Sequence, residues 1–139
     1  MADMRSILAF DVGTKTIGVA RVYVRGPRVP SPLTTLSRKS VKKDAAALAA
    51  LCKKHDAAEL VVGLPYELDG TEGRSARLAR QIGEALAALT GLPVHYQDER
   101  YSTVEASHRL QQQGLTARQQ RAVIDQAAAA VILEDWLNQ

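Results

Sequence analysis

The sequence predicts an α/β fold in which a mixed five-stranded sheet, three antiparallel strands followed by two parallel strands, carries helices on both faces. Three observations predict it. Strand-like apolar segments come first, within residues 7–36. Segments with helical spacing then alternate with short continuous apolar runs, which are typical of parallel strands covered on both faces. Two further helical segments close the chain, so we expect a single domain over residues 1–139.

The first three strands are predicted near residues 7–10, 17–24 and 29–36. The first segment is continuously apolar and the second alternates and is rich in valine, so the short turn between them predicts a hairpin. Gly26-Pro27 ends the second strand. Two prolines, at positions 30 and 32, restrict the third segment to an irregular edge strand, because proline cannot donate a hydrogen bond to a neighbouring strand.

The rest of the chain alternates helices with strands. Ser40 predicts the cap of a helix over about residues 41–55, and Thr71 that of a helix ending near residue 89. Residues 60–63 and 94–97 are the strands that follow these helices. Ser102 and Thr116 start segments with capping-box spacing, which predict two final helices that end near residues 113 and 136.

Composition limits the class of protein. Hydrophobic residues make up 46% and charged residues 24% of the chain, which is typical of soluble globular proteins. No apolar run approaches the roughly 20 residues needed to cross a bilayer, and the first residues lack a signal-peptide pattern, so we expect a cytoplasmic protein without a membrane partner. Cys52 is the single cysteine, which excludes an internal disulfide and a thiolate metal cluster.

Charge is distributed unevenly along the chain, whose net charge is +3. Residues 1–60 carry 11 Lys/Arg against 5 Asp/Glu, whereas residues 61–139 carry 7 against 10. A basic first half favours a polyanionic partner such as nucleic acid, and the acids of the second half could serve chemistry. Solvated surface faces are the alternative interpretation.

Acidic residues from three parts of the chain are candidates for one site. Asp11 ends the first strand, either Asp98 or Glu99 follows the last strand, and Asp125 lies in the final helix beside an apolar stripe. The ends of parallel strands share one edge of a sheet, so the first two positions should meet there. Gly13 has backbone freedom and no side chain, which would let a phosphate or hydrated metal approach.

Clustered carboxylates repel one another unless a cation neutralises them, and oxygen ligands favour Mg²⁺ or Mn²⁺. Two such ions can activate a water and stabilise the leaving oxygen of a phosphodiester, which predicts a carboxylate nuclease. Two other interpretations stay open. Asp11 could be an ordinary turn residue of a hairpin, and Asp125 could form a salt bridge with Arg121 four residues earlier.

Four sequence blocks, in matching order and spacing over nearly the whole chain, resemble the YqgF (RuvX) family. They are residues 11–20, Gly63-Leu64-Pro65 with Asp69-Gly70, Asp98-Glu99-Arg100 with Ser102-Thr103, and Ile124-Asp125 with Ala128-Ala129 and Ile132-Leu133. The resemblance implies an RNase H-like nuclease domain. It also implies maturation of the 5′ end of pre-16S rRNA in ribosome biogenesis or, as the alternative, Holliday junction resolution in DNA recombination and repair.

Carried over to the matching positions, the resemblance implies that Asp11, Glu99 and Asp125 bind Mg²⁺ or Mn²⁺ and are the catalytic residues. The residues implied or expected to meet the substrate phosphates are Gly13, Lys15, Arg100 and Thr103. The basic contribution of the glutamine-rich region at 108–121 is left to arginines, namely Arg109, Arg118 and Arg121.

Other functions and assembly states stay open on sequence grounds. A non-catalytic nucleic-acid-binding module would keep the fold without turnover. The phosphate-binding half of an actin-like ATPase or sugar kinase would share the Asp-x-Gly turn, although such enzymes need a second domain to close over the nucleotide. A resolvase would work as a symmetric homodimer, but no dimer face is evident, so both monomer and homodimer are retained.

Overall fold

The computed structural model describes residues 3–99 and 102–139, apart from the side chain of Ala122. The strands are β1 (Ser6–Val12), β2 (Thr16–Tyr23), β3 (Ser31–Ser37), β4 (Ala57–Leu64) and β5 (Val94–Asp98). The helices are α1 (Val41–Lys54), α2 (Arg74–Thr90), α3 (Ser102–Gln112) and α4 (Ala117–Leu137).

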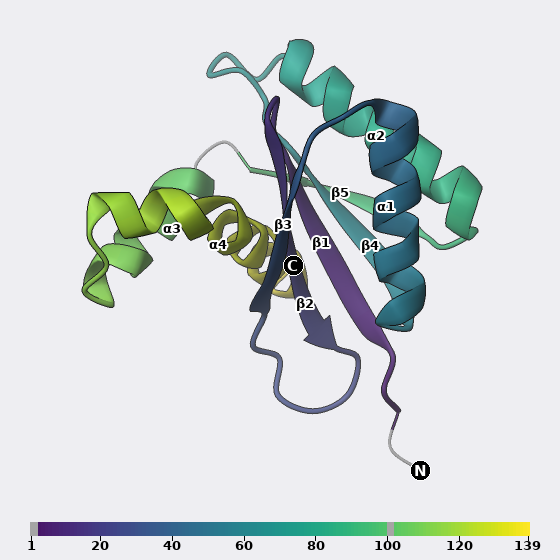
Figure 1. Ribbon diagram of the computed structural model, residues 1–139, viewed down its shortest axis with the longest axis horizontal. Helices are drawn as coiled ribbons and strands as arrows, with labels where there is room; N and C mark the ends of the chain where they lie inside the picture. Colours follow the sequence, from purple (N-terminus) through teal and green to yellow (C-terminus); the bar gives the residue numbers. More distant parts are fainter. Residues whose placement is uncertain (1–2, 100–101) are drawn as a thin grey trace.

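The five strands form one sheet in the order β3-β2-β1-β4-β5. β1, β2 and β3 pair antiparallel, whereas β4 lies parallel to β1 and β5 parallel to β4. The sheet separates α1 and α2 on one side from α3 and α4 on the other (Figure 1). The predicted mixed sheet with helices on both faces is therefore confirmed.

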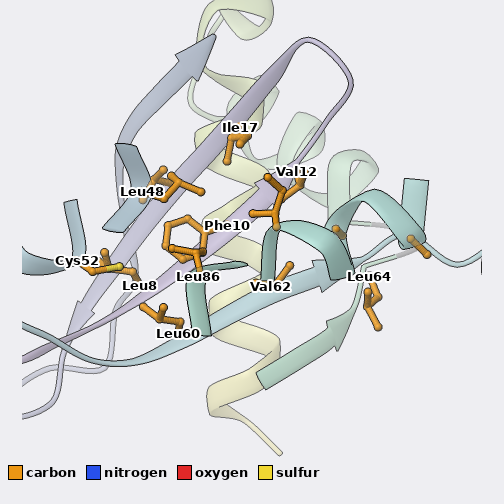
Figure 2. Close-up of a cluster of buried hydrophobic side chains, with 14 residues drawn as sticks. Leu8, Phe10, Val12, Ile17, Leu48, Cys52, Leu60, Val62, Leu64 and Leu86 are labelled. Carbon is orange, nitrogen blue, oxygen red and sulfur yellow. The ribbon is translucent and has the colours of Figure 1, made fainter. Parts of the chain in front are cut away.

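Alternation along β1 assigns its side chains to two different layers. Leu8, Phe10 and Val12 belong to the apolar cluster under α1 and α2 (Figure 2). Ile7 and Ala9 instead join the cluster formed with residues of α4, namely Ile132, Leu133 and Trp136. Because side chains alternate along a strand, Asp11 follows Ile7 and Ala9 and faces α4.

Element boundaries agree with the prediction at most helix starts. The Ser40 hydroxyl accepts a hydrogen bond from the Lys43 amide, and Thr116 forms a capping box with Gln119. β3 is an edge strand with a register shift opposite Val19 and Ala20, as its prolines predicted. None of the helices in the described ranges has the length and apolar character that a membrane crossing requires.

Two predicted caps are wrong, and in each case the hydroxyl has another partner. Thr71 does not cap α2, because its hydroxyl donates to Asp69 at 2.7 Å within the preceding turn, and α2 starts at Arg74. The Ser102 hydroxyl does not cap α3 but donates back to Glu99, as described below. Glu105, the expected partner of that cap, instead accepts from Arg109.

Candidate active site

The residue beside Asp11 on the neighbouring strand β2 is a glycine, which has no side chain. Its partner across the β1–β2 pairing is Gly18. A Cβ atom at Gly18 would lie only 1.9 Å from the backbone oxygen of Asp125 and 2.1 Å from its carbonyl carbon. The glycine therefore lets the backbone of α4 rest on β2, which brings Asp125 to the row that contains Asp11.

A second glycine makes room on the other side of Asp11. Phe10 pairs with Val62 in β4, so Gly63 follows in the same row as Asp11. A Cβ atom there would lie 2.7 Å from the carboxyl carbon of Glu99 and 2.7 Å from Cδ1 of Ile132. The sequence analysis gave these two glycines no structural role, although glycine inside a valine-rich strand is itself a sign of close approach.

Glu99, and not Asp98, points into the structure. The side chain of Asp98 is exposed, whereas Glu99 is only 8% exposed. The Glu99 amide donates to the Leu64 carbonyl at 3.1 Å, which fixes the chain just beyond β5. The Ser102 hydroxyl donates to Oε2 of Glu99 at 3.1 Å, and Oε1 is buried with no hydrogen-bond partner. One oxygen of this carboxyl is therefore held and the other is unsatisfied.

The carboxyls of Asp11 and Glu99 interact directly, and their protonation is coupled. Burial raises the pKa of Asp11, and the charge of Asp125 raises it further against the opposing effect of the contact with Glu99. Burial also raises the pKa of Glu99. The charge of Asp11 raises this pKa further, whereas the hydrogen bond from the Ser102 hydroxyl lowers it. Two carboxyls in so little water favour a shared proton or a bound cation.

Asp125 approaches this pair but is engaged elsewhere. The Thr16 hydroxyl, at the start of β2, donates to Oδ2 of Asp125. The alternative salt bridge with Arg121 is not among the ion pairs of the described residues. As the side chains stand in residues 3–99 and 102–139, no three His, Cys, Asp or Glu groups surround a point where a metal ion could be held.

An arginine braces the turn that follows Asp11. Arg38 donates through Nη1 to the Gly13 carbonyl at 2.9 Å and through Nε to Asp44 at 2.5 Å. The Arg38 amide also donates to the Lys15 carbonyl at 2.8 Å. The side chains of Arg38 and Asp44 are only 12% and 5% exposed, so this ion pair is buried beneath the surface of α1. Sequence analysis missed it because neither residue lies within a recognisable motif.

Position 13 favours glycine because there is no room for a side chain, not because the backbone angle is unusual. Among the described residues, Gly13 is not one of the glycines with a positive φ angle. A Cβ atom at this position would instead lie 2.9 Å from the carbonyl oxygen of Thr16, which accepts a hydrogen bond from the Gly13 amide at 2.9 Å. The absence of a side chain thus keeps the turn between β1 and β2 tight.

The predicted phosphate contacts have different surroundings. Lys15 and Thr103 are exposed, Lys15 on the turn after β1 and Thr103 in the first turn of α3. Arg100 lies outside the described residues. Arg109 is engaged by Glu105 and by both carboxyl oxygens of Glu134, so it holds α3 against α4. Its expected basic contribution toward a substrate is therefore used within the protein.

Two solved structures of a Thermus thermophilus protein have the same fold. The chain aligns with the structure of T. thermophilus RuvC with a TM-score of 0.62, at 15% identity, over 96% of each chain. It aligns with T. thermophilus RuvC in complex with a Holliday junction substrate with a TM-score of 0.57, at 15% identity, over 93% of this chain and 90% of that one. The fold, with Asp11 at the end of its central strand β1, is RNase H-like.

Sequence comparison identifies the family within this class. Residues 5–139 match the model of the family described as "RuvX: Holliday junction resolvase". A protein of Anaeromyxobacter dehalogenans named "Putative pre-16S rRNA nuclease" is 45% identical over 94% of this chain and 95% of its own length. Relatives of the same name in Moorella thermoacetica and Thermosynechococcus vestitus are 44% and 38% identical, over 95% and 97% of this chain and 94% and 89% of their own lengths. The chain belongs to the RuvX family and is a nuclease.

Proposed function

We propose that the protein is a metal-dependent endonuclease whose catalytic residues are Asp11, Glu99 and Asp125. The observation that carries this proposal is the contact between the half-buried carboxyl of Asp11 and the buried carboxyl of Glu99, whose Oε1 has no hydrogen-bond partner. A buried carboxyl oxygen without a partner is costly in a structure that serves no ligand. A divalent cation bound by this pair would remove both the unsatisfied oxygen and the repulsion.

The residues fit a hard divalent ion such as Mg²⁺ or Mn²⁺. The donors are all carboxyl oxygens, which these ions prefer, and no thiolate or imidazole belongs to the group. The ion would be held by Asp11 and Glu99, with Asp125 as a third ligand once its carboxylate leaves the Thr16 hydroxyl. Bound there, it would supply activation of a water and neutralisation of charge on the phosphoryl group.

The remaining groups position the reacting parts. The Ser102 hydroxyl holds Oε2 of Glu99, so that Oε1 is the oxygen directed to the ligand. Arg38 holds the Gly13 carbonyl, which keeps the turn after Asp11 in place and leaves its outer side to the substrate. The residues proposed to contact substrate phosphates are Gly13, Lys15, Thr103 and Arg100.

The proposed substrate is structured RNA, with maturation of the 5′ end of pre-16S rRNA in the cytoplasm as the biological role. The support is the shared name of the curated relatives, which align over nearly their whole lengths. Cleavage of Holliday junctions is the second candidate. Its support is the description of the family and the junction in the T. thermophilus RuvC complex. This second role would require a homodimer that cuts two strands symmetrically, whereas RNA cleavage is compatible with a monomer.

A single-turnover cleavage assay tests the catalytic assignment. A pre-16S rRNA fragment and a four-way DNA junction are each incubated with the protein and Mg²⁺ or Mn²⁺. Asp11→Asn and Glu99→Gln should slow cleavage of the true substrate by at least about 100-fold. Asp98→Asn is the matched control for Glu99→Gln, because it neutralises the adjacent but exposed carboxylate, and it should keep most of the activity. Equal cleavage by Asp11→Asn and the unchanged protein would contradict the assignment.

The same assay separates the nuclease from a non-catalytic binding module. A binding module would retain both nucleic acids on the protein but leave them intact at every metal concentration. The nuclease would convert the substrate to products in proportion to the metal present. The position of the cut in the RNA arm, relative to the mature 5′ end, then tests the proposed role in ribosome biogenesis.

A further inference from the structure

The segment between Asp11 and Asp56 is unusually basic. Residues 12–55 contain ten Lys/Arg and a single acid, Asp44. Asp44 does not neutralise the surface around it, because its side chain is buried and both oxygens are used. One oxygen accepts from Arg38 at 2.5 Å, and the other accepts from the backbone amide of Lys39 at 3.0 Å. The lysines of this segment therefore stand without an acidic counterpart from their own part of the chain.

Four of these lysines gather beside the turn that follows Asp11. Lys15 lies in that turn, Lys39 lies just before α1, and Lys42 and Lys43 lie in the first turn of α1. All four side chains are exposed. The two segments are joined directly, because the Arg38 amide donates to the Lys15 carbonyl at 2.8 Å. Figure 1 shows the start of α1 and the turn between β1 and β2 at the same end of the sheet. We call Lys15, Lys39, Lys42 and Lys43 the amino-terminal lysine cluster.

Two lysines of the cluster lie where the helix dipole disfavours positive charge. The first turn of a helix carries a partial positive charge, so cations there are unfavourable and anions favourable. Lys42 and Lys43 occupy this unfavourable end of α1, whereas Lys53 and Lys54 occupy the last turn, where cations are favourable. Every ion pair of the described residues has an arginine or histidine as its cation, so none of the four lysines is paired with a carboxylate of residues 3–99 or 102–139. This arrangement favours an anionic partner from outside.

A groove beside the cluster is lined by two of its lysines together with apolar residues, among them Leu36, Ala46 and Ala47. Its volume is about 460 Å³, and its rim includes Lys39, Lys43 and Ser37 from the junction of β3 with α1. Exposed ammonium groups bind phosphate as point charges without reading the bases. The groove also contains the buried Asp44, whose two oxygens are already occupied, so it does not repel an anion as an unpaired carboxylate would.

We propose that the amino-terminal lysine cluster binds the sugar-phosphate backbone of the nucleic-acid substrate and leads it over the turn at Gly13 to Asp11. The proposal rests on the proposed nuclease function for the identity of its partner. Arg38 connects the two regions, since the same side chain and amide contact the turn on one side and α1 on the other. The shared ligand chemistry is a run of phosphodiesters, which RNA and DNA both provide.

The test compares two charge reversals on one helix. Lys42→Glu with Lys43→Glu changes the start of α1, and Lys53→Glu with Lys54→Glu makes the identical change in net charge at its end. Binding of a fluorescent pre-16S rRNA fragment and of a four-way DNA junction is measured by anisotropy in EDTA, at several salt concentrations. Near 0.1 M salt the affinity of the first variant should be lower by a factor of about ten or more. The slope of its log binding constant against log salt concentration should be smaller in magnitude by about 1 to 2. The second should bind within about twofold of the unchanged protein.

Thermal melting distinguishes lost binding from lost folding. Acids at the start of a helix and cations at its end are favourable, so the first variant should melt at the same or a higher temperature than the unchanged protein, and the second at the same or a lower one. Weaker binding by the first variant without a lower melting temperature would support nucleic-acid binding by the amino-terminal lysine cluster. Equal effects of the two variants on binding, or no effect of the first, would overturn it.

The assay also keeps this proposal separate from the nuclease proposal. Binding is read without metal, so cluster-dependent binding together with absent cleavage would overturn the nuclease proposal and leave the contact surface intact. Failure of the unchanged protein to bind either nucleic acid would overturn the contact surface. The arm that responds to the first variant, RNA or DNA, identifies which phosphate backbone the surface serves.

Discussion

At the end of β1, one face of the sheet carries an apolar side chain and the other carries a carboxylate. Under α1 and α2, Phe10 lies in a continuous apolar cluster and is fully buried. One residue later and on the opposite face, Asp11 lies between Gly18 and Gly63, where the backbone of α4 at Asp125 and the carboxyl of Glu99 occupy the space that side chains would fill. The first face is apolar along β1 as far as Val12, whereas on the second face the apolar cluster of Ile7 and Ala9 gives way to carboxyls at Asp11.

The sheet itself separates the residues that stabilise the fold from those of the candidate site. Alternation along a strand gives each face its own side chains, so a site can be placed on one face without disturbing the other. On the second face, burial raises the pKa values of Asp11 and Glu99, and Oε1 of Glu99 has no hydrogen-bond partner, so this face carries an electrostatic cost that the first face does not. Removing the side chain of Phe10 should therefore destabilise the fold, whereas neutralising the neighbouring carboxylate of Asp11 should stabilise it in the absence of metal.

The largest expected effect is on the apolar face. Phe10→Ala should lower the free energy of unfolding by about 3–5 kcal/mol, because it removes a fully buried aromatic ring and leaves a cavity. Urea unfolding measures the loss, and cleavage at low temperature should persist because Phe10 points away from the site. A loss of less than about 1 kcal/mol would mean that this face can collapse around the gap.

The next effect is on the opposite face, where adding one carbon should cost both stability and activity. Gly18→Ala should lower the free energy of unfolding by about 1–3 kcal/mol, since its Cβ would overlap the backbone of Asp125 and push α4 away. Cleavage should fall further than the folded fraction does. Gly83→Ala is the control, because its Cβ would meet the ring of Tyr96, which can turn aside, and alanine favours the helix. Equal loss of cleavage in the two variants would contradict this role for Gly18.

A smaller effect, opposite in sign, is expected for Asp11. Asp11→Asn should raise the free energy of unfolding of the metal-free protein by on the order of 1–3 kcal/mol, because it removes a half-buried negative charge beside Glu99. It should also abolish the thermal stabilisation that Mn²⁺ gives to the unchanged protein. Calorimetry with and without Mn²⁺ measures both. If Asp11→Asn is less stable than the unchanged protein without metal, the two carboxyls do not repel each other in the fold.

The smallest effect is a pH dependence that follows from the same pair. Burial raises the pKa values of Asp11 and Glu99 in the folded chain, so folding favours their protonated forms. The stability they contribute is therefore fully present below the unfolded carboxyl pKa of about 4 and is lost as pH rises through the higher folded values. The difference in melting temperature between Asp11→Asn and the unchanged, metal-free protein should widen over this range. A difference that narrows as pH rises would have the wrong sign for this cause.

Much of the fold follows from local sequence patterns. The paired strands, the cap at Ser40, the capping box at Thr116 and the irregular edge strand with its prolines each depend on residues close together in the chain. Thr71 and Ser102 were misread for a physical reason. A hydroxyl that can cap a helix can equally serve a nearby carboxyl, and spacing alone does not decide which partner is closer.

The candidate site was predictable in its acids but not in its supports. Asp11, Glu99 and Asp125 stand at strand ends or on an apolar stripe, where a carboxylate is conspicuous in the sequence. Residue alternation left Asp98 and Glu99 open, because alternation fails where a strand ends. The family resemblance implied Glu99, and in the structure it is Glu99 that is buried and Asp98 that is exposed. Thr16, the partner of Asp125, and Arg38, the partner of Asp44, lie in ordinary polar segments. Only the packing of the fold brings each into contact with its carboxylate.

The two glycines beside Asp11 also have a consequence for how this sequence can vary. At Gly18 and Gly63, any side chain would overlap the backbone of Asp125 or the carboxyl of Glu99, so neither position can exchange glycine for even the smallest alternative without moving an acid. A saturation library scored for cleavage should therefore show two intolerant columns in strands that are otherwise permissive to apolar exchange. Such a pair of columns would locate the site in a relative of unknown structure from its mutational record alone.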